Sequence, residues 1–281
     1  MSLKKIANVV LVTILLFSSF QIVVKLIDYK KSEKLYSEIQ NIVTSIENNV
    51  DNSKDSETEN ITTYEKLKEI NSDYQFWVEV ENTNISYPVV QGQDNSYYLK
   101  KDFNKKESSA GTIFMDALND FDVDNNVVLY GHNMNNKTMF NNITHFKKED
   151  FFNKNNKIRI KHNKDEKEYV YEVFSVYHSD NTFDYNTVRF GEGYSFSSFI
   201  NDIKNKSMYK NDIEVTENDK IITLSTCSYE FKGAKTTIHA KLVDTIYLNP
   251  KKQLEEEQRK EEEKKLESAQ DDIDQMVNYS E

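Results

Sequence analysis

Eight short segments rich in β-branched and aromatic residues limit the fold of this chain more than any other feature. They lie between residues 71 and 249, and clusters of Asn, Asp, Gly and Lys separate them, as turns separate strands. The segments are 76–80, 85–90, 112–115, 127–130, 157–161, 169–177, 221–224 and 236–243. Because an open sheet would leave strand edges exposed, we expect a mostly β fold in which the eight strands form a closed barrel. Two short helices, 138–146 and 195–203, are expected to interrupt it.

The N-terminus predicts a membrane anchor. Lys4 and Lys5 precede a mostly apolar run, 6–24, and a helix needs about 20 such residues to cross a bilayer. No small-x-small cleavage site follows the run, as one would after a signal peptide. We therefore predict an uncleaved signal anchor over 1–27, with a single crossing and the rest of the chain outside the cell. A buried core helix is the alternative reading.

Three further regions complete the predicted organisation. Residues 28–70 form a juxtamembrane helical segment, in which Leu35, Ile39 and Val43 belong to one apolar stripe at helical spacing. We expect this stripe to pack on the main domain rather than on a partner, and the polar stretch 51–60 to form a loop or hinge. Residues 71–249 form the barrel. The tail, 250–281, carries eleven acids and six bases, and is expected to be a solvated helix or disordered.

Composition excludes several classes of function. The net charge is −11 and the chain has only three arginines, so clustered positive charge for nucleic-acid binding is missing. The sequence contains no CxxC, HExxH or EF-hand pattern and only 6 glycines, so neither a metal site nor a nucleotide-phosphate loop is predicted. We expect no cofactor.

Two residues at the ends of predicted strands are candidates for chemistry. Cys227 is the only cysteine, and it ends the strand-like run 221–227. An unpaired cysteine can be a buried inert thiol, an intermolecular bridge or a nucleophile. His132 follows the predicted strand 127–130 and Gly131, a position suited to acid–base work near neutral pH. The other four histidines lack such a setting.

Several motifs together resemble the sortases, Gram-positive enzymes that attach surface proteins to the cell wall. Residues 223–227, TLSTC, are similar to the family's cysteine signature, and residues 129–133, LYGHN, to its histidine motif. Other segments resemble class B sortases in particular, and these are Trp77, 85–91, 98–99 and 111–116, with the N-terminal helices and the helix near Ser195. The resemblance covers residues 64 to 247.

The resemblance implies a cysteine transpeptidase of the cell membrane with an extracellular catalytic domain. Cys227 would attack a C-terminal sorting motif, of Asn-Pro-x-Thr or Ser/Pro-Pro-x-Thr type, after its Thr. The acyl group would then pass from the resulting thioester to an amine of a peptidoglycan precursor or cross-bridge. His132 would act as the proton donor and Ser225 as a substrate contact. Its expected partners are surface proteins with sorting signals, the cell-wall amine and the membrane.

The sequence departs from the family at the third catalytic position. Sortases carry an Arg on the strand after the cysteine, and here Lys235 falls at that position. Lysine keeps the positive charge but lacks the planar fork of donors. Arg189 is a less favoured substitute. This departure motivates the alternative of a catalytically impaired binding module. Two others are a papain-like protease, disfavoured because His132 precedes Cys227 in the chain, and a structural protein, which leaves the motifs unexplained.

Overall fold

The computed structural model describes residues 3–52, 62–154, 156–162, 164–180 and 182–248, with short pieces at 253–254, 257–259, 261–262 and 265–266. Most of the charged tail predicted at 250–281 therefore lies outside the described residues.

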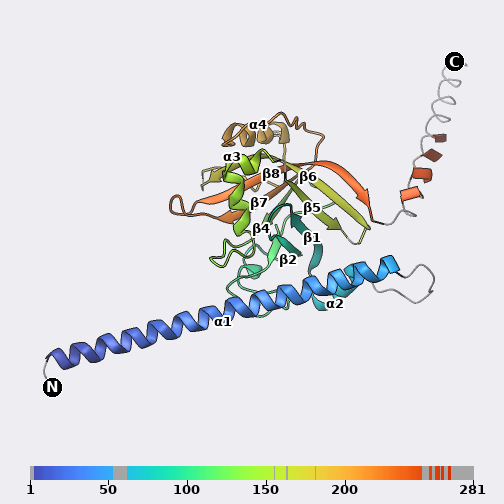
Figure 1. Ribbon diagram of the computed structural model, residues 1–281. Coiled ribbons are helices and arrows are strands. Elements are labelled where there is room, and N and C mark those ends of the chain that lie inside the picture. Colours follow the sequence, from blue (N-terminus) through green and yellow to red (C-terminus); the bar gives the residue numbers. More distant parts are fainter. Residues whose placement is uncertain are drawn as a thin grey trace, which may run out of the picture.

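Within these residues, eight strands close into a barrel in the order β1-β2-β3-β4-β7-β8-β6-β5, which confirms the predicted fold class (Figure 1). The strands are β1 Tyr74–Val80, β2 Ser86–Gln91, β3 Ile113–Met115, β4 Asn126–Tyr130, β5 Lys157–His162, β6 Lys167–Ser179, β7 Ile221–Cys227 and β8 Lys235–Tyr247. The last pair, β6 with β8, is longer than the sequence predicted, at 13 residues each. The main hydrophobic core contains aromatic and aliphatic side chains such as Trp77, Phe114 and Leu224.

The strand order fixes where the functional segments meet. β4 and β7 are parallel neighbours, and Tyr130 lies beside Ser225 in their register. The chain therefore leaves both strands at the same end of the barrel. β8 runs back antiparallel to β7, so Lys235 is the Cα partner of Cys227.

The two predicted helices are present with different limits. The second is α4, Phe196–Lys206, whose first turn is capped by the Ser195 hydroxyl accepting from the Ser198 N–H. The first was predicted to begin at residue 138, but the structure has a 3-10 helix, η2, over Asn141–Lys147, followed by α3, Glu149–Phe152. Lys137 and Met139 have positive φ angles of 63° and 56°, which a helix cannot contain, so the helix begins only after this turn.

The N-terminal helix α1 runs from Leu3 to Asn52 without a break, and α2, Thr63–Ile70, follows. Residues 3–26 of α1 are exposed, whereas Tyr36, Ile39 and Val43 are buried. The Tyr36 hydroxyl donates to the Gly111 carbonyl at 2.7 Å. The prediction that the apolar stripe packs on the barrel is thus confirmed. The start of the predicted 51–60 hinge is helical, and residues 53–60 lie outside the described residues.

β8 carries a buried histidine, His239, which is the Cα partner of Thr223 on β7. The Thr223 hydroxyl donates to the Asn126 side chain at 2.7 Å, so the His239 Nδ1–H donates to Thr223, also at 2.7 Å. The Tyr177 hydroxyl is then free to donate to His239 Nε2 at 2.9 Å. Burial lowers the pKa of His239 from 6.5 to about 3, so its ring is neutral.

This burial predicts an acid-sensitive core. Below pH 6.5 the unfolded chain binds a proton at His239 that the folded protein does not bind until about pH 3. The free energy of unfolding should therefore fall with decreasing pH across this window, by up to ~1.4 kcal/mol per pH unit from this group. Thermal unfolding in detergent tests the point. We expect acidification from about pH 7 to about pH 5 to lower the midpoint less in His239→Gln than in the parent, and equal losses would contradict it.

Candidate active site

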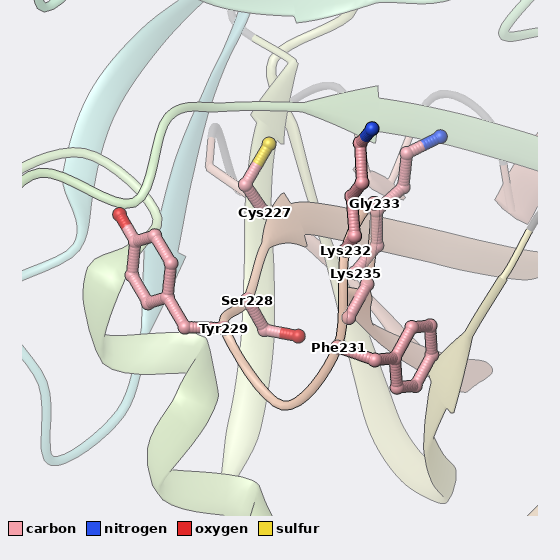
Figure 2. A pocket seen from close by; sticks show the side chains of 8 residues that line it. Cys227, Ser228, Tyr229, Phe231, Lys232, Gly233 and Lys235 are labelled. Atoms are coloured by element: carbon pink, nitrogen blue, oxygen red, sulfur yellow. The ribbon is translucent and has the colours of Figure 1, made fainter.

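Cys227 is the last residue of β7, and it is the first in that strand to reach solvent. The six residues before it are buried, which fixes the strand in the barrel wall, while the thiol itself is exposed. Figure 2 shows the sulfur projecting beyond the strand, to the same side as the side chains of Lys232 and Lys235. A rigidly held and accessible thiol near positive charge is the arrangement that a nucleophile requires.

His132 lies at the end of the neighbouring strand, two residues after Tyr130. Gly131 between them is required by close approach, because a Cβ there would lie 2.4 Å from Ile113 Cδ1 and 2.7 Å from Phe140 Cγ. The His132 Nε2 lies 2.7 Å from the Leu99 carbonyl oxygen, which can only accept, so Nε2 carries the hydrogen in this contact. Nδ1 is then the nitrogen available for proton exchange.

Hydrogen bonds tie the two catalytic candidates to one another's segments. The Asn133 side-chain amide donates to the Cys227 carbonyl at 2.8 Å, and the Thr226 hydroxyl donates to the Gly131 carbonyl at 2.7 Å. The relative position of the thiol and the imidazole is therefore set by the backbones of both strand ends. Both residues line the same cleft of about 360 Å³.

Lys235 lines this cleft as well, directly across the β7–β8 pair from Cys227. Its Nζ lies 5.2 Å from the centroid of the Tyr185 ring, a cation–π contact. The Ser225 hydroxyl, also in the cleft wall, donates to the Tyr185 hydroxyl at 3.0 Å. The side chain of Tyr185 thus orients both residues.

The structure brings together Cys227, His132, Lys235 and Ser225, but not Arg189, which is exposed and is not part of the cleft lining. Sequence reasoning missed Tyr185, together with Leu99 and Asn186 in the cleft wall. Tyr185 and Asn186 come from the irregular segment between β6 and α4, where no periodicity or motif marks them.

Glu230 anchors the β7–β8 loop, residues 228–234, to two other elements. One carboxylate oxygen pairs with Lys147 of η2, and the other lies 3.3 Å from His178 Nδ1 of β6. Partial burial raises the pKa of Glu230, but the hydrogen bond from Lys147 and other contacts outweigh it and bring the value to about 2. The loop between the two cleft residues is therefore held by a carboxylate that stays charged.

The sequence is similar to that of known sortases. The family profile for the sortase domain matches residues 78–243. Sortase B of Staphylococcus aureus is 31% identical over 245 residues, covering 85% of this chain and 96% of the relative.

Solved structures give the same result. The crystal structure of Clostridium perfringens sortase B is 41% identical, covers 64% of this chain and 100% of its own, and superposes with a TM-score of 0.61. A Staphylococcus aureus sortase B–substrate complex is 27% identical, covers 78% and 99%, and has a TM-score of 0.66. The chain therefore belongs to the sortase family, in class B, and is a cysteine transpeptidase.

Proposed function

We propose that this sortase cleaves a C-terminal sorting motif of Asn-Pro-x-Thr or Ser/Pro-Pro-x-Thr type after its Thr, and joins the new acyl group to a cell-wall amine. The observation that carries the proposal is the shared cleft, in which Cys227, His132 and Lys235 come from the adjacent ends of three hydrogen-bonded strands. Ser225 is a substrate contact in the same wall. The similar Staphylococcus aureus structure is a sortase B–substrate complex, which supports substrate binding by this chain.

Cys227, Lys235 and His132 have separate roles in the proposed reaction. The Cys227 thiolate attacks the Thr carbonyl carbon, and the ammonium of Lys235 stabilises the oxyanion of the tetrahedral intermediate. The C–N bond breaks as the His132 imidazolium donates its Nδ1 proton to the leaving amine and becomes neutral, which leaves a thioester on Cys227. A peptidoglycan precursor or cross-bridge amine then attacks the thioester and gives its proton to His132. The C–S bond breaks and the thiolate returns.

Membrane anchoring through residues 1–27 is part of the proposal. The N-terminal part of α1 is long and apolar enough to cross a membrane, and its most apolar stretch is not buried against the barrel. Residues 28–70 would then connect the anchor to an extracellular catalytic domain, 71–249, followed by the charged tail, 250–281. The surface proteins that carry sorting signals would reach the enzyme at the membrane.

A panel of sorting-motif peptides tests the function. The full chain in detergent is incubated with each peptide and with hydroxylamine as acceptor, and products are identified by mass spectrometry. We expect a hydroxamate at the Thr carbonyl for one class of motif. Products cut at another bond, or products that persist in a Cys227→Ala control, would contradict the proposal.

Substitutions at Lys235 distinguish a working enzyme from a catalytically impaired binding module. Lys235→Met should lower kcat/KM by ~10–10²-fold, somewhat less than the loss of an ideal oxyanion donor. Lys235→Arg should restore the bidentate donor and raise kcat above the parent. If the parent binds peptide without turnover and Lys235→Arg is also inactive, the impaired binding module is the better description.

Glu230 should act as a positioning residue. Glu230→Gln removes the charge that holds the loop to Lys147, and we expect kcat to fall by about tenfold with KM nearly unchanged, because small displacements of reacting groups are costly. Glu172→Gln is the matched control, since Glu172 pairs with Lys157 at 3.0 Å on β5 and β6, outside the cleft lining. Equal kcat in the two variants would rule out a positioning role for Glu230.

A further inference from the structure

The free half of α1 leaves the barrel beside the active-site cleft. Ser109 donates from its backbone N–H to the Asp28 carboxylate at 3.1 Å, and its hydroxyl bonds to the same oxygen. A cavity of about 490 Å³ lies between Asp28 and His132. On the N-terminal side of this point, residues 3–27 of the helix are exposed. The candidate active site therefore lies close to where the helix leaves the protein surface.

The length of the free half leaves little spacing between the barrel and a bilayer. Residues 3–27 span about 37 Å as a helix, at 1.5 Å per residue, and the hydrocarbon core is about 30 Å thick. If these residues cross the membrane, the bilayer surface lies near Asp28. Because α1 continues unbroken into the part that packs on the barrel, its direction fixes which side of the barrel faces the lipid.

The β7–β8 loop extends on that side and has an unusual composition for a solvent loop. Figure 1 shows it projecting from the barrel toward the side on which the free half of α1 lies. Its side chains include Tyr229, which is 75% exposed, Phe231, which is 45% exposed, and the exposed Lys232. Exposed aromatic rings next to a lysine are the composition that the headgroup region of a membrane favours. Leu99 lines the same cleft as Cys227 and Lys235, the two residues that flank this loop.

We propose that the tip of the β7–β8 loop, Tyr229 to Lys232, rests in the lipid headgroup region of the membrane that α1 enters. The rings lie at the interface and the lysine pairs with anionic lipid phosphates. This contact would orient the cleft toward the membrane surface, where a substrate still held in the bilayer can reach it. The inference rests on the proposed membrane anchor.

Fluorescence quenching by brominated lipids tests the contact. The full chain is reconstituted in vesicles of phosphatidylcholine and phosphatidylglycerol. In one set of vesicles the acyl chains carry bromine on carbons close to the headgroup, and in the other set they carry none. Phe231→Trp reports on the loop, Phe17→Trp on the anchor, and Ile246→Trp, an exposed position at the far end of β8, is the control. The single native tryptophan, Trp77, is buried and gives the background, measured in the parent.

We expect the indole introduced at position 231 to lose roughly half or more of its emission in brominated vesicles, as for a side chain ~5–10 Å into the interface. The control at position 246 should lose no more than the parent. If position 17 is quenched and position 231 is not, the loop contact is wrong while the anchor stands. If neither is quenched, the anchor and the loop contact both fail. Quenching at 231 and 246 alike would indicate general adsorption and also overturn the proposal.

Discussion

The Cys227→Ala variant is expected to lose all measurable cleavage and transfer. Every step of the proposed reaction passes through a bond to the Cys227 sulfur, and the chain contains no second cysteine that could replace it. Alanine removes the nucleophile without adding bulk, and the strand that carries it is held by six buried residues. The expected loss is therefore chemical rather than structural. Peptide turnover followed by mass spectrometry measures it.

Two controls accompany this variant. Because Cys227 is exposed, its replacement should leave the thermal unfolding midpoint nearly unchanged. Binding of the sorting peptide should also persist, since the cleft walls formed by Ser225, Tyr185 and Leu99 are intact. An active, normally folded Cys227→Ala protein would show that the reaction does not use the thiol.

His132→Gln is expected to lower kcat by ~10²–10⁴-fold, the usual contribution of a positioned acid–base group. Glutamine can still donate to the Leu99 carbonyl, the contact that His132 Nε2 makes at 2.7 Å, but it cannot exchange a proton near neutral pH. The loss should appear in kcat more than in KM, because the proton transfer occurs in the reaction and not in binding. Steady-state kinetics with the best peptide of the panel measures both.

His145→Gln is the matched control for His132. His145 belongs to η2, is only partly buried, and stacks edge-on with Phe151 away from the cleft lining. Partial burial and nearby lysines lower the pKa of His145. Near-parental activity in this variant with a large loss in His132→Gln supports the assignment, and comparable effects in both would contradict it.

The barrel was predictable because each strand carries a local signal. β-branched and aromatic runs such as 221–224 alternate with turn residues, and closure follows from the need to hide strand edges. Strand ends were less predictable. β6 and β8 extend each other by mutual pairing up to Lys167 and Tyr247, which is a long-range contact that local composition does not encode. The predicted helix start at residue 138 was wrong, because η2 begins only at Asn141. Lys137 and Met139 have positive φ angles but are not glycines, so the sequence gives no signal of this turn.

The active site was likewise predictable only in part. Cys227 and His132 were identified because the first ends a strand-like run, the second follows one, and each belongs to a motif. Their proximity depends on β4 and β7 being parallel neighbours, which no local pattern reveals. Tyr185 contacts Lys235 and Ser225 from an irregular segment, so only the folded chain shows that it belongs to the cleft. Glu230 likewise acquires its partners, Lys147 and His178, only through tertiary packing.

The central claim is that the acyl group passes through a thioester on Cys227, and intact-mass spectrometry tests it most directly. The full chain is mixed with a sorting peptide in the absence of an acceptor amine. The reaction is quenched in acid, and the intact mass of the protein is measured. We predict a covalent adduct equal to the peptide up to its Thr, located on Cys227 by digestion, released by hydroxylamine and absent from Cys227→Ala. Turnover of the same peptide with no adduct on Cys227 at any time, or an adduct on another residue, would contradict the account.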